Sequence, residues 1–287
     1  MHDASLSMRR MSFDDQAATF DRRAGLPGSA AEEVAAAVVS LAGLGSGDRL
    51  VEVGAGSGDI GCHLVGRVAY IGFDLAPSML EVFRDRLGAR ASVARLVVAD
   101  GDAAWPVADG SVRAIFGSRS LHLLSLPHVL AEIHRVGVPE GVTLLVGHVV
   151  RDESSVRMWM RRQMRRLLRE MGIEGRSGGG QLALDLVDAC AESDSHYVAT
   201  PIAPHVVRRW SIASSPADSL AAWAGKDGLA GIAMDARTKN EVLERLRSRA
   251  VVEFGDLDRR VEATEAYVLE GVRFSPKTQS QRTPHEE

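Results

Sequence analysis

The sequence predicts an α/β protein with a doubly wound, mostly parallel β-sheet. First, short apolar strands alternate with helical stretches of about ten residues over residues 29–150. Second, a glycine-rich loop, GAGSG, directly follows the first strand, where ligands of open α/β sheets bind. Third, 45% of the residues are hydrophobic and 25% are charged, which is typical of a globular protein that can bury a core.

The chain begins with 28 residues that precede this alternation, and they include a short polar helical stretch, FDDQAATFDRRAG. That stretch is expected to end at the sequence GLPG. A second helix then starts at Ser29, because Ser29 and Glu32 have the spacing of a capping box. Gly43 and Gly45 are expected to end it.

Five apolar segments then predict the strands of a core over residues 29–150. They are 50–53, 69–73, 95–98, 114–117 and 142–150. Helical patterns separate them, most clearly PSMLEVFRDRLG, where Pro77 suits the first turn of a helix, and SLPHVLAEIHRVG. Strands joined through helices in this way predict βαβ units with helices on both faces of the sheet.

The pattern changes after the fifth strand. Residues 152–172 read as one long helix, and a glycine run at 178–180 separates it from a second helix. We therefore predict a helical substrate cap over residues 151–200. Residues 201–274 are expected to complete a seven-stranded sheet, and the polar residues 275–287 a disordered tail.

The long helix is amphipathic, with methionines and leucines on one side and arginines on the other. The favoured interpretation is a packing helix with a solvated arginine face. An alternative is that Trp159, Met160 and Met164 contact a bulky apolar substrate. A third is that the arginines dock an acidic carrier protein or a second copy of the chain, forming a homodimer.

Composition argues against several classes of protein. A net charge of −4 gives no general attraction to nucleic acid or to an acidic membrane. The two cysteines, Cys62 and Cys190, have neither a disulfide-scaffold pattern nor metal-ligand spacing, and no histidine cluster indicates a metal. The sequence shows no signal peptide or transmembrane run, so we expect a cytoplasmic protein without a metal.

The glycine loop can be read in two ways. Gly54, Gly56 and Gly58 form G-x-G-x-G, which suggests S-adenosylmethionine, whereas Gly56, Gly58 and Gly61 form the dinucleotide pattern G-x-G-x-x-G. Glu52 lies inside the preceding strand, where the dinucleotide reading expects only apolar residues.

Two further acids favour the nucleoside reading. Asp74 at the tip of the second strand could accept both ribose hydroxyls. Asp102 follows the third strand and could accept a hydrogen bond from the adenine amine. No obvious place remains for a pyrophosphate or a nicotinamide.

At this point the sequence resembles a class I S-adenosylmethionine-dependent methyltransferase. The resemblance rests on VEVGAGSGDIG, YIGFDLAPSML, VVADGDAAWP and GSRSLHLL in this order. It is most similar to the group of ubiquinone, menaquinone and small-molecule methyltransferases, strongly over residues 13–150 and more weakly over 196–273. It implies a Rossmann-like fold, S-adenosylmethionine as cofactor and S-adenosylhomocysteine as product.

The resemblance also implies roles for particular residues. Those that approach the methionine part of the cofactor are Glu52, Gly54, Ala55, Gly56, Gly58 and Ser118. Those that meet its ribose and adenine are Asp74, Leu75, Met79, Asp102 and Ala103. The leading helix of the family closes over the cofactor, which implies contacts from Phe20 and Arg23, and from Phe13 toward the substrate.

The predicted reaction is methyl transfer to an oxygen or nitrogen of a small molecule, in secondary metabolism. The reaction is an in-line displacement, and histidine is the natural base for a phenol or amine. Two histidines follow strands at the ligand edge, His122 and His148. His122 stands alone where many relatives have paired histidines. A quinone-type C-methyltransferase and a nicotinamide-dependent oxidoreductase are the alternatives.

Overall fold

We analysed a computed structural model of the chain, which describes residues 26–173, 182–193 and 195–277. The chain divides into two compact units. Unit 1 comprises residues 1–148, 181–207 and 268–287, and unit 2 comprises residues 149–180 and 208–267. The lid candidates Phe13, Phe20 and Arg23 and most of the predicted tail lie outside the described residues.

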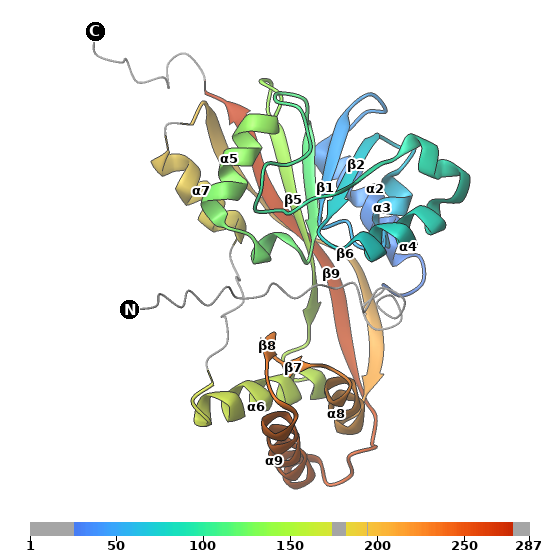
Figure 1. Cartoon of the computed structure of the whole chain (residues 1–287), viewed down its shortest axis with the longest axis vertical. Helices are drawn as coiled ribbons and strands as arrows, with labels where there is room; N and C mark the ends of the chain where they lie inside the picture. Colours follow the sequence, from blue (N-terminus) through green and yellow to red (C-terminus); the bar gives the residue numbers. More distant parts are fainter. Residues whose placement is uncertain (1–25, 174–181, 194, 278–287) are drawn as a thin grey trace, which may run out of the picture. The chain divides into compact units, whose positions relative to one another are not determined.

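A seven-stranded sheet organises unit 1, with the strand order β3-β2-β1-β4-β5-β9-β6 (Figure 1). Its strands are β1 (Arg49–Val53), β2 (Ala69–Asp74), β3 (Arg95–Val98), β4 (Ala114–Ser118), β5 (Val142–Arg151), β6 (Tyr197–Ser214) and β9 (Val261–Pro276). The pairs β1–β2, β2–β3, β1–β4 and β4–β5 are parallel. The predicted Rossmann-like, mostly parallel seven-stranded sheet is confirmed.

The strand register brings the predicted binding segments to one edge. Val53 lies opposite Phe73 and Ser118 opposite Gly147, so β1, β2 and β4 end close together, and β5 continues past Gly147 to Arg151. The carboxyl edge of parallel strands is where open α/β sheets bind their ligands. The glycine loop after β1 and Asp74 at the end of β2 therefore occupy the expected position.

Helices of unit 1 cover both faces of this sheet. They are α2 (Ala30–Ala42), α3 (Gly61–Leu64), α4 (Pro77–Leu87), α5 (Leu126–Val136) and α7 (Leu182–Glu192), with the short 3₁₀ helices η2 (Gly88–Val93) and η3 (Leu121–Leu123). On one face, α5 and α7 share a buried cluster with Val51 and Ile115. On the other, Tyr70 contacts Phe83 of α4 edge to face.

Two sequence expectations need correction. α7 lies within unit 1, because Leu186 and Cys190 are buried in the same cluster as Ile133 of α5. Residues 151–200 therefore do not form one continuous segment of a cap. Ser29 does precede α2, but its hydroxyl donates to the Glu33 carboxylate at 2.7 Å instead of capping the helix.

Unit 2 is built from helices with one small hairpin. It contains α6 (Val156–Glu170), α8 (Pro216–Ala224) and α9 (Ala236–Phe254), with the two-residue strands β7 (Gly228–Leu229) and β8 (Ile232–Ala233) (Figure 1). The apolar side of α6 packs against Val242 and Leu246 of α9. Throughout the described residues, no helix combines the length and apolarity needed to cross a bilayer.

Candidate functional site

The glycine loop adopts a conformation that side chains rarely allow. Gly54, Gly56 and Gly58 have φ angles of 71°, 55° and 74°, in the left-handed region that favours glycine. The amides of Gly54 and Ala55 both donate to the carbonyl of Phe73, at 2.9 and 3.0 Å. The loop is therefore tied to the end of β2.

Asp74 completes this arrangement. Its carboxylate accepts hydrogen bonds from the amides of Gly56 and Ala76, each at 2.9 Å. Each oxygen keeps acceptor capacity for a ligand hydroxyl. A Cβ added at Gly56 would meet no heavy atom within 4 Å, and the neighbouring Leu75 is 45% exposed. A fixed carboxylate beside open backbone and an accessible apolar side chain fits a ribose and its base.

The acid after β3 is held in a similar way. Asp102 accepts a hydrogen bond from the amide of Ser125 at 2.7 Å, and its own amide donates to Asp100 at 3.0 Å. The next residue, Ala103, is exposed. The predicted adenine-side acid is thus positioned by neighbouring backbone.

A salt-bridge network anchors the segment that follows Asp102. Glu132 of α5 accepts from the amide of Trp105 at 2.8 Å and from Arg135 at 2.6 Å. Arg135 also donates to the carbonyls of Trp105 and Val107, at 3.0 and 2.9 Å. Desolvation acts to raise the pKa of Glu132, but the hydrogen bonds from Arg135 and Trp105 outweigh it and lower that pKa.

Glu52 is buried beside Tyr70 and Gly61. It is 3% exposed and accepts a hydrogen bond from the Tyr70 hydroxyl, and a Cβ at Gly61 would lie 2.5 Å from its carboxylate. Burial raises the pKa of Glu52 to about 8, the Tyr70 hydroxyl opposes this, and the charges of Asp74 and Asp59 add to it. The structure thus places Glu52 beneath the glycine loop as a neutral acid near neutral pH.

This burial predicts a pH-dependent stability. A carboxyl whose folded pKa exceeds the unfolded value of 4.5 stabilises the fold at low pH, and the contribution is lost as pH rises toward 8. We expect the Tm of the wild type to fall relative to Glu52→Gln by roughly 10 °C between pH 5 and pH 8. Thermal unfolding followed by circular dichroism measures this. Parallel pH profiles for the two proteins would contradict the assignment.

The end of β4 supplies further polar groups. Ser120 donates a hydrogen bond to the carbonyl of Val53, and Ser118 ends the strand opposite Gly147. Arg119 between them has a φ of 60°, which is uncommon for a residue with a side chain and marks local strain. Sequence patterns gave no signal for Arg119. His122 follows on η3 and is exposed.

His148 and Glu270 form a pair near the carboxyl end of β5. The Nδ1 atom of His148 lies 3.9 Å from Oε1 of Glu270, on the neighbouring strand β9. Their side chains are 38% and 25% exposed. Glu270 was not predicted, although an acid within the apolar run EAYVLEGVRF is the same kind of signal that singled out Glu52.

The other predicted contact residues are largely buried. Met160 and Met164 are 0% and 2% exposed within the core of unit 2, so their side chains pack against α9. Trp159 is partly buried there and contacts Phe254 edge to face at 4.9 Å. Met79 is 3% exposed and packs with Ala76 and Val82.

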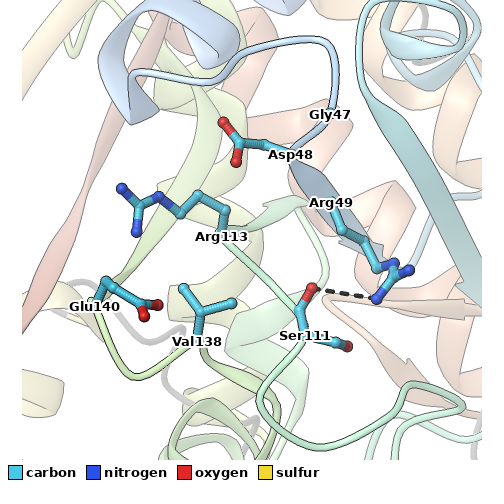
Figure 2. A pocket seen from close by; sticks show the side chains of 7 residues that line it. All are labelled: Gly47, Asp48, Arg49, Ser111, Arg113, Val138 and Glu140. Carbon is cyan, nitrogen blue, oxygen red and sulfur yellow. Dashed lines mark hydrogen bonds between the residues drawn. The ribbon is translucent and has the colours of Figure 1, made fainter.

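A cavity of about 270 Å³ lies at the opposite edge of the sheet (Figure 2). Arg49 begins β1, Arg113 precedes β4 and Glu140 precedes β5, so these lining residues stand at the amino ends of the strands. Arg49 donates to the carbonyl of Ser111 at 3.3 Å. This cavity is therefore separate from the glycine-loop site.

The comparison with known protein families agrees with the position of the glycine loop and the two acids. Residues 50–141 match the family model described as a methyltransferase domain, a segment that contains the glycine loop, Asp74 and Asp102. The chain carries a class I, S-adenosylmethionine-dependent methyltransferase domain. Its methyl donor is S-adenosylmethionine, and the matched segment contains Asp74, Leu75 and Asp102, the residues predicted to contact the nucleoside.

Solved structures show the same fold at low sequence identity. YcgJ of Bacillus subtilis is 14% identical with a TM-score of 0.52, over 85% of this chain and 98% of that one. A protein of Bacillus halodurans described as a putative methyltransferase is 15% identical with a TM-score of 0.53, over 85% and 99%. No curated protein matches the sequence significantly.

Proposed function

We propose that this methyltransferase modifies an oxygen or nitrogen of a small molecule and that His148 is the base. The observation that carries the proposal is the His148–Glu270 pair, because a carboxylate beside Nδ1 favours the tautomer whose Nε2 can accept a proton. His122 has an exposed side chain, and the Glu270 carboxylate lies beside His148 instead. The small-molecule substrate, the cytoplasmic location and the place in secondary metabolism are part of the same proposal.

The residues have distinct tasks in this scheme. The bound cofactor supplies an electrophilic methyl group, and the chain must orient the acceptor in line with it and exclude water. His148 takes the proton from the acceptor hydroxyl or amine, and Glu270 stabilises the imidazolium that forms. Glu270 is thus a positioning residue.

We also propose that residues 1–28 are an N-terminal lid segment that closes over the cofactor. The amide of Leu26 donates to Asp59 at 3.1 Å, and Asp59 also pairs with Arg86 at 3.2 Å. Asp59 directly follows the glycine loop. A segment that joins the chain at this point can reach a bound cofactor, which supports the proposed contacts of Phe20 and Arg23 and, for the acceptor, of Phe13.

The proposed base can be tested by measuring S-adenosylhomocysteine release with a panel of simple phenols, catechols and amines. With an accepted substrate, His148→Ala should lower kcat about 100-fold or more. Glu270→Gln should lower kcat about 10-fold with unchanged KM, Tm and cofactor affinity. His122→Ala and His205→Ala, which replace exposed histidines, should change kcat less than about 3-fold.

Two results would contradict this proposal. A large loss in His122→Ala with full activity in His148→Ala would assign the base to His122. Full activity in both variants would show that no histidine base is used, and transfer to a carbon nucleophile of the quinone type would then be the better hypothesis.

A further inference from the structure

The arginines of α6 fall into two rows with different surroundings. In one row, Arg162 pairs with Glu153 and Arg166 pairs with Glu170, each at 3.0 Å. Glu170 also accepts from Arg249 of α9 at 2.6 Å. This row has the usual character of a solvated, charge-balanced helix surface.

The second row consists of Arg157, Arg161 and Arg165, four residues apart and so aligned along the helix. Arg151 at the end of β5 joins them, and we call these four residues the arginine cluster. Its only carboxylate in the described part of the chain is Glu265, which accepts from Arg151 and Arg157, each at 3.1 Å. No described carboxylate lies within ion-pair distance of Arg161 or Arg165.

Arg161 lies close enough to Arg151 and Arg165 for their charges to act on it. Desolvation lowers the pKa of Arg161, and repulsion from Arg151 and Arg165 lowers it further. A guanidinium remains charged at physiological pH in spite of such a shift. Arg151 and Arg157 therefore share one acid whose side chain is 7% exposed, and Arg161 and Arg165 extend the row along α6. Basic residues also outnumber acidic ones in unit 2, although the whole chain is acidic.

We propose that the arginine cluster is a binding site for the phosphate or diphosphate group of a small molecule. Guanidinium groups bind phosphoryl oxygens in bidentate fashion, and a multivalent oxyanion would relieve the repulsion among the four side chains. The shared contact of Arg151 and Arg157 with one nearly buried acid holds these two guanidinium groups close together, which favours a compact anion over the extended surface of an acidic protein. This inference concerns unit 2 alone and is independent of the assignment of the methyl acceptor.

Titration calorimetry of the full chain with sodium pyrophosphate, at ionic strength held constant with sodium chloride, tests the site. The wild type should bind saturably. The double variant Arg161→Gln/Arg165→Gln should bind at least about 10-fold more weakly. The matched control Arg162→Gln/Arg166→Gln removes the same charge from the same helix and should bind within about 2-fold of the wild type.

Thermal unfolding without ligand provides a second readout. Removal of Arg161 and Arg165 relieves repulsion, so that variant should unfold at the same or a higher temperature than the wild type, and its weaker binding then cannot come from misfolding. No saturable binding by the wild type, or an equal loss in both double variants, would overturn the proposal. Binding of a hexaglutamate peptide without binding of pyrophosphate would also overturn it, in favour of an acidic protein partner.

Discussion

Asp74→Ala is expected to weaken binding of S-adenosylmethionine and S-adenosylhomocysteine about 100-fold or more. The carboxylate is the acceptor available for the ribose hydroxyls, and loss of a charged acceptor costs about 1.5–3 kcal/mol for each hydrogen bond. The substitution also releases the amides of Gly56 and Ala76, so the loop loses its anchor. Isothermal titration of both sulfur nucleosides measures the effect.

The controls separate the ribose role from the loop role. Asp74→Asn loses the charge and keeps one acceptor oxygen, so it can retain the hydrogen bond from only one of the two amides, and its affinity should be intermediate. Asp85→Ala removes an exposed acid from α4 and should bind like the wild type. NADH should not bind to any of these proteins. Wild-type affinity in Asp74→Ala, or NADH binding to the wild type, would refute the assignment of the site.

The second large effect is expected from a pair of glycines in the same loop. A Cβ at Gly58 would lie 2.1 Å from the ring of Phe83, which is fully buried, and the φ of 74° adds left-handed strain. Gly58→Ala should therefore destabilise the fold by about 2–5 kcal/mol. Gly56→Ala has similar strain but no neighbour within 4 Å, so about 1–2 kcal/mol is expected.

The loss of cofactor affinity should follow the opposite order, with the larger loss in Gly56→Ala. The methyl group of Gly56→Ala projects into the open space where the cofactor approaches the backbone, so this variant should stay folded at 25 °C and lose affinity for S-adenosylhomocysteine. Denaturant unfolding and titration calorimetry of both proteins provide the comparison. Equal stability of the two variants would show that Phe83 moves aside, and unchanged affinity in Gly56→Ala would place the cofactor elsewhere.

The features that sequence predicted well are those encoded by local pattern. Each strand from β1 to β5 is a short apolar run, and the glycine loop and Asp74 lie directly after such runs. Because parallel strands end at one edge of a sheet, local positions in the sequence were enough to predict that these groups meet. The helix after the glycine run at 178–180 was predicted for the same reason, and the structure gives it the bounds Leu182–Glu192.

What the sequence did not predict depends on contacts between distant segments. The association of α7 with α5 results from burial of Leu186 against Ile133, which no local pattern encodes. His148 and Glu270 meet because β9 lies beside β5 in the sheet. Met160 and Met164 have the helical spacing of either a packing face or a substrate surface, and only their burial in the unit 2 core identifies the packing role.

The Glu132–Arg135 network has a consequence for how the cofactor is recognised. It fixes the segment after Asp102 to α5 before any ligand arrives, so the entropy cost of ordering that segment is met during folding and does not reduce affinity. The segment beside the predicted adenine-side acid should therefore keep its conformation for as long as α5 stays folded. Local unfolding of α5 would then weaken recognition of the base, while the predicted ribose contacts of Asp74 would stay intact. Substitutions at Arg135 would change the affinity for the cofactor without changing a residue predicted to contact the nucleoside.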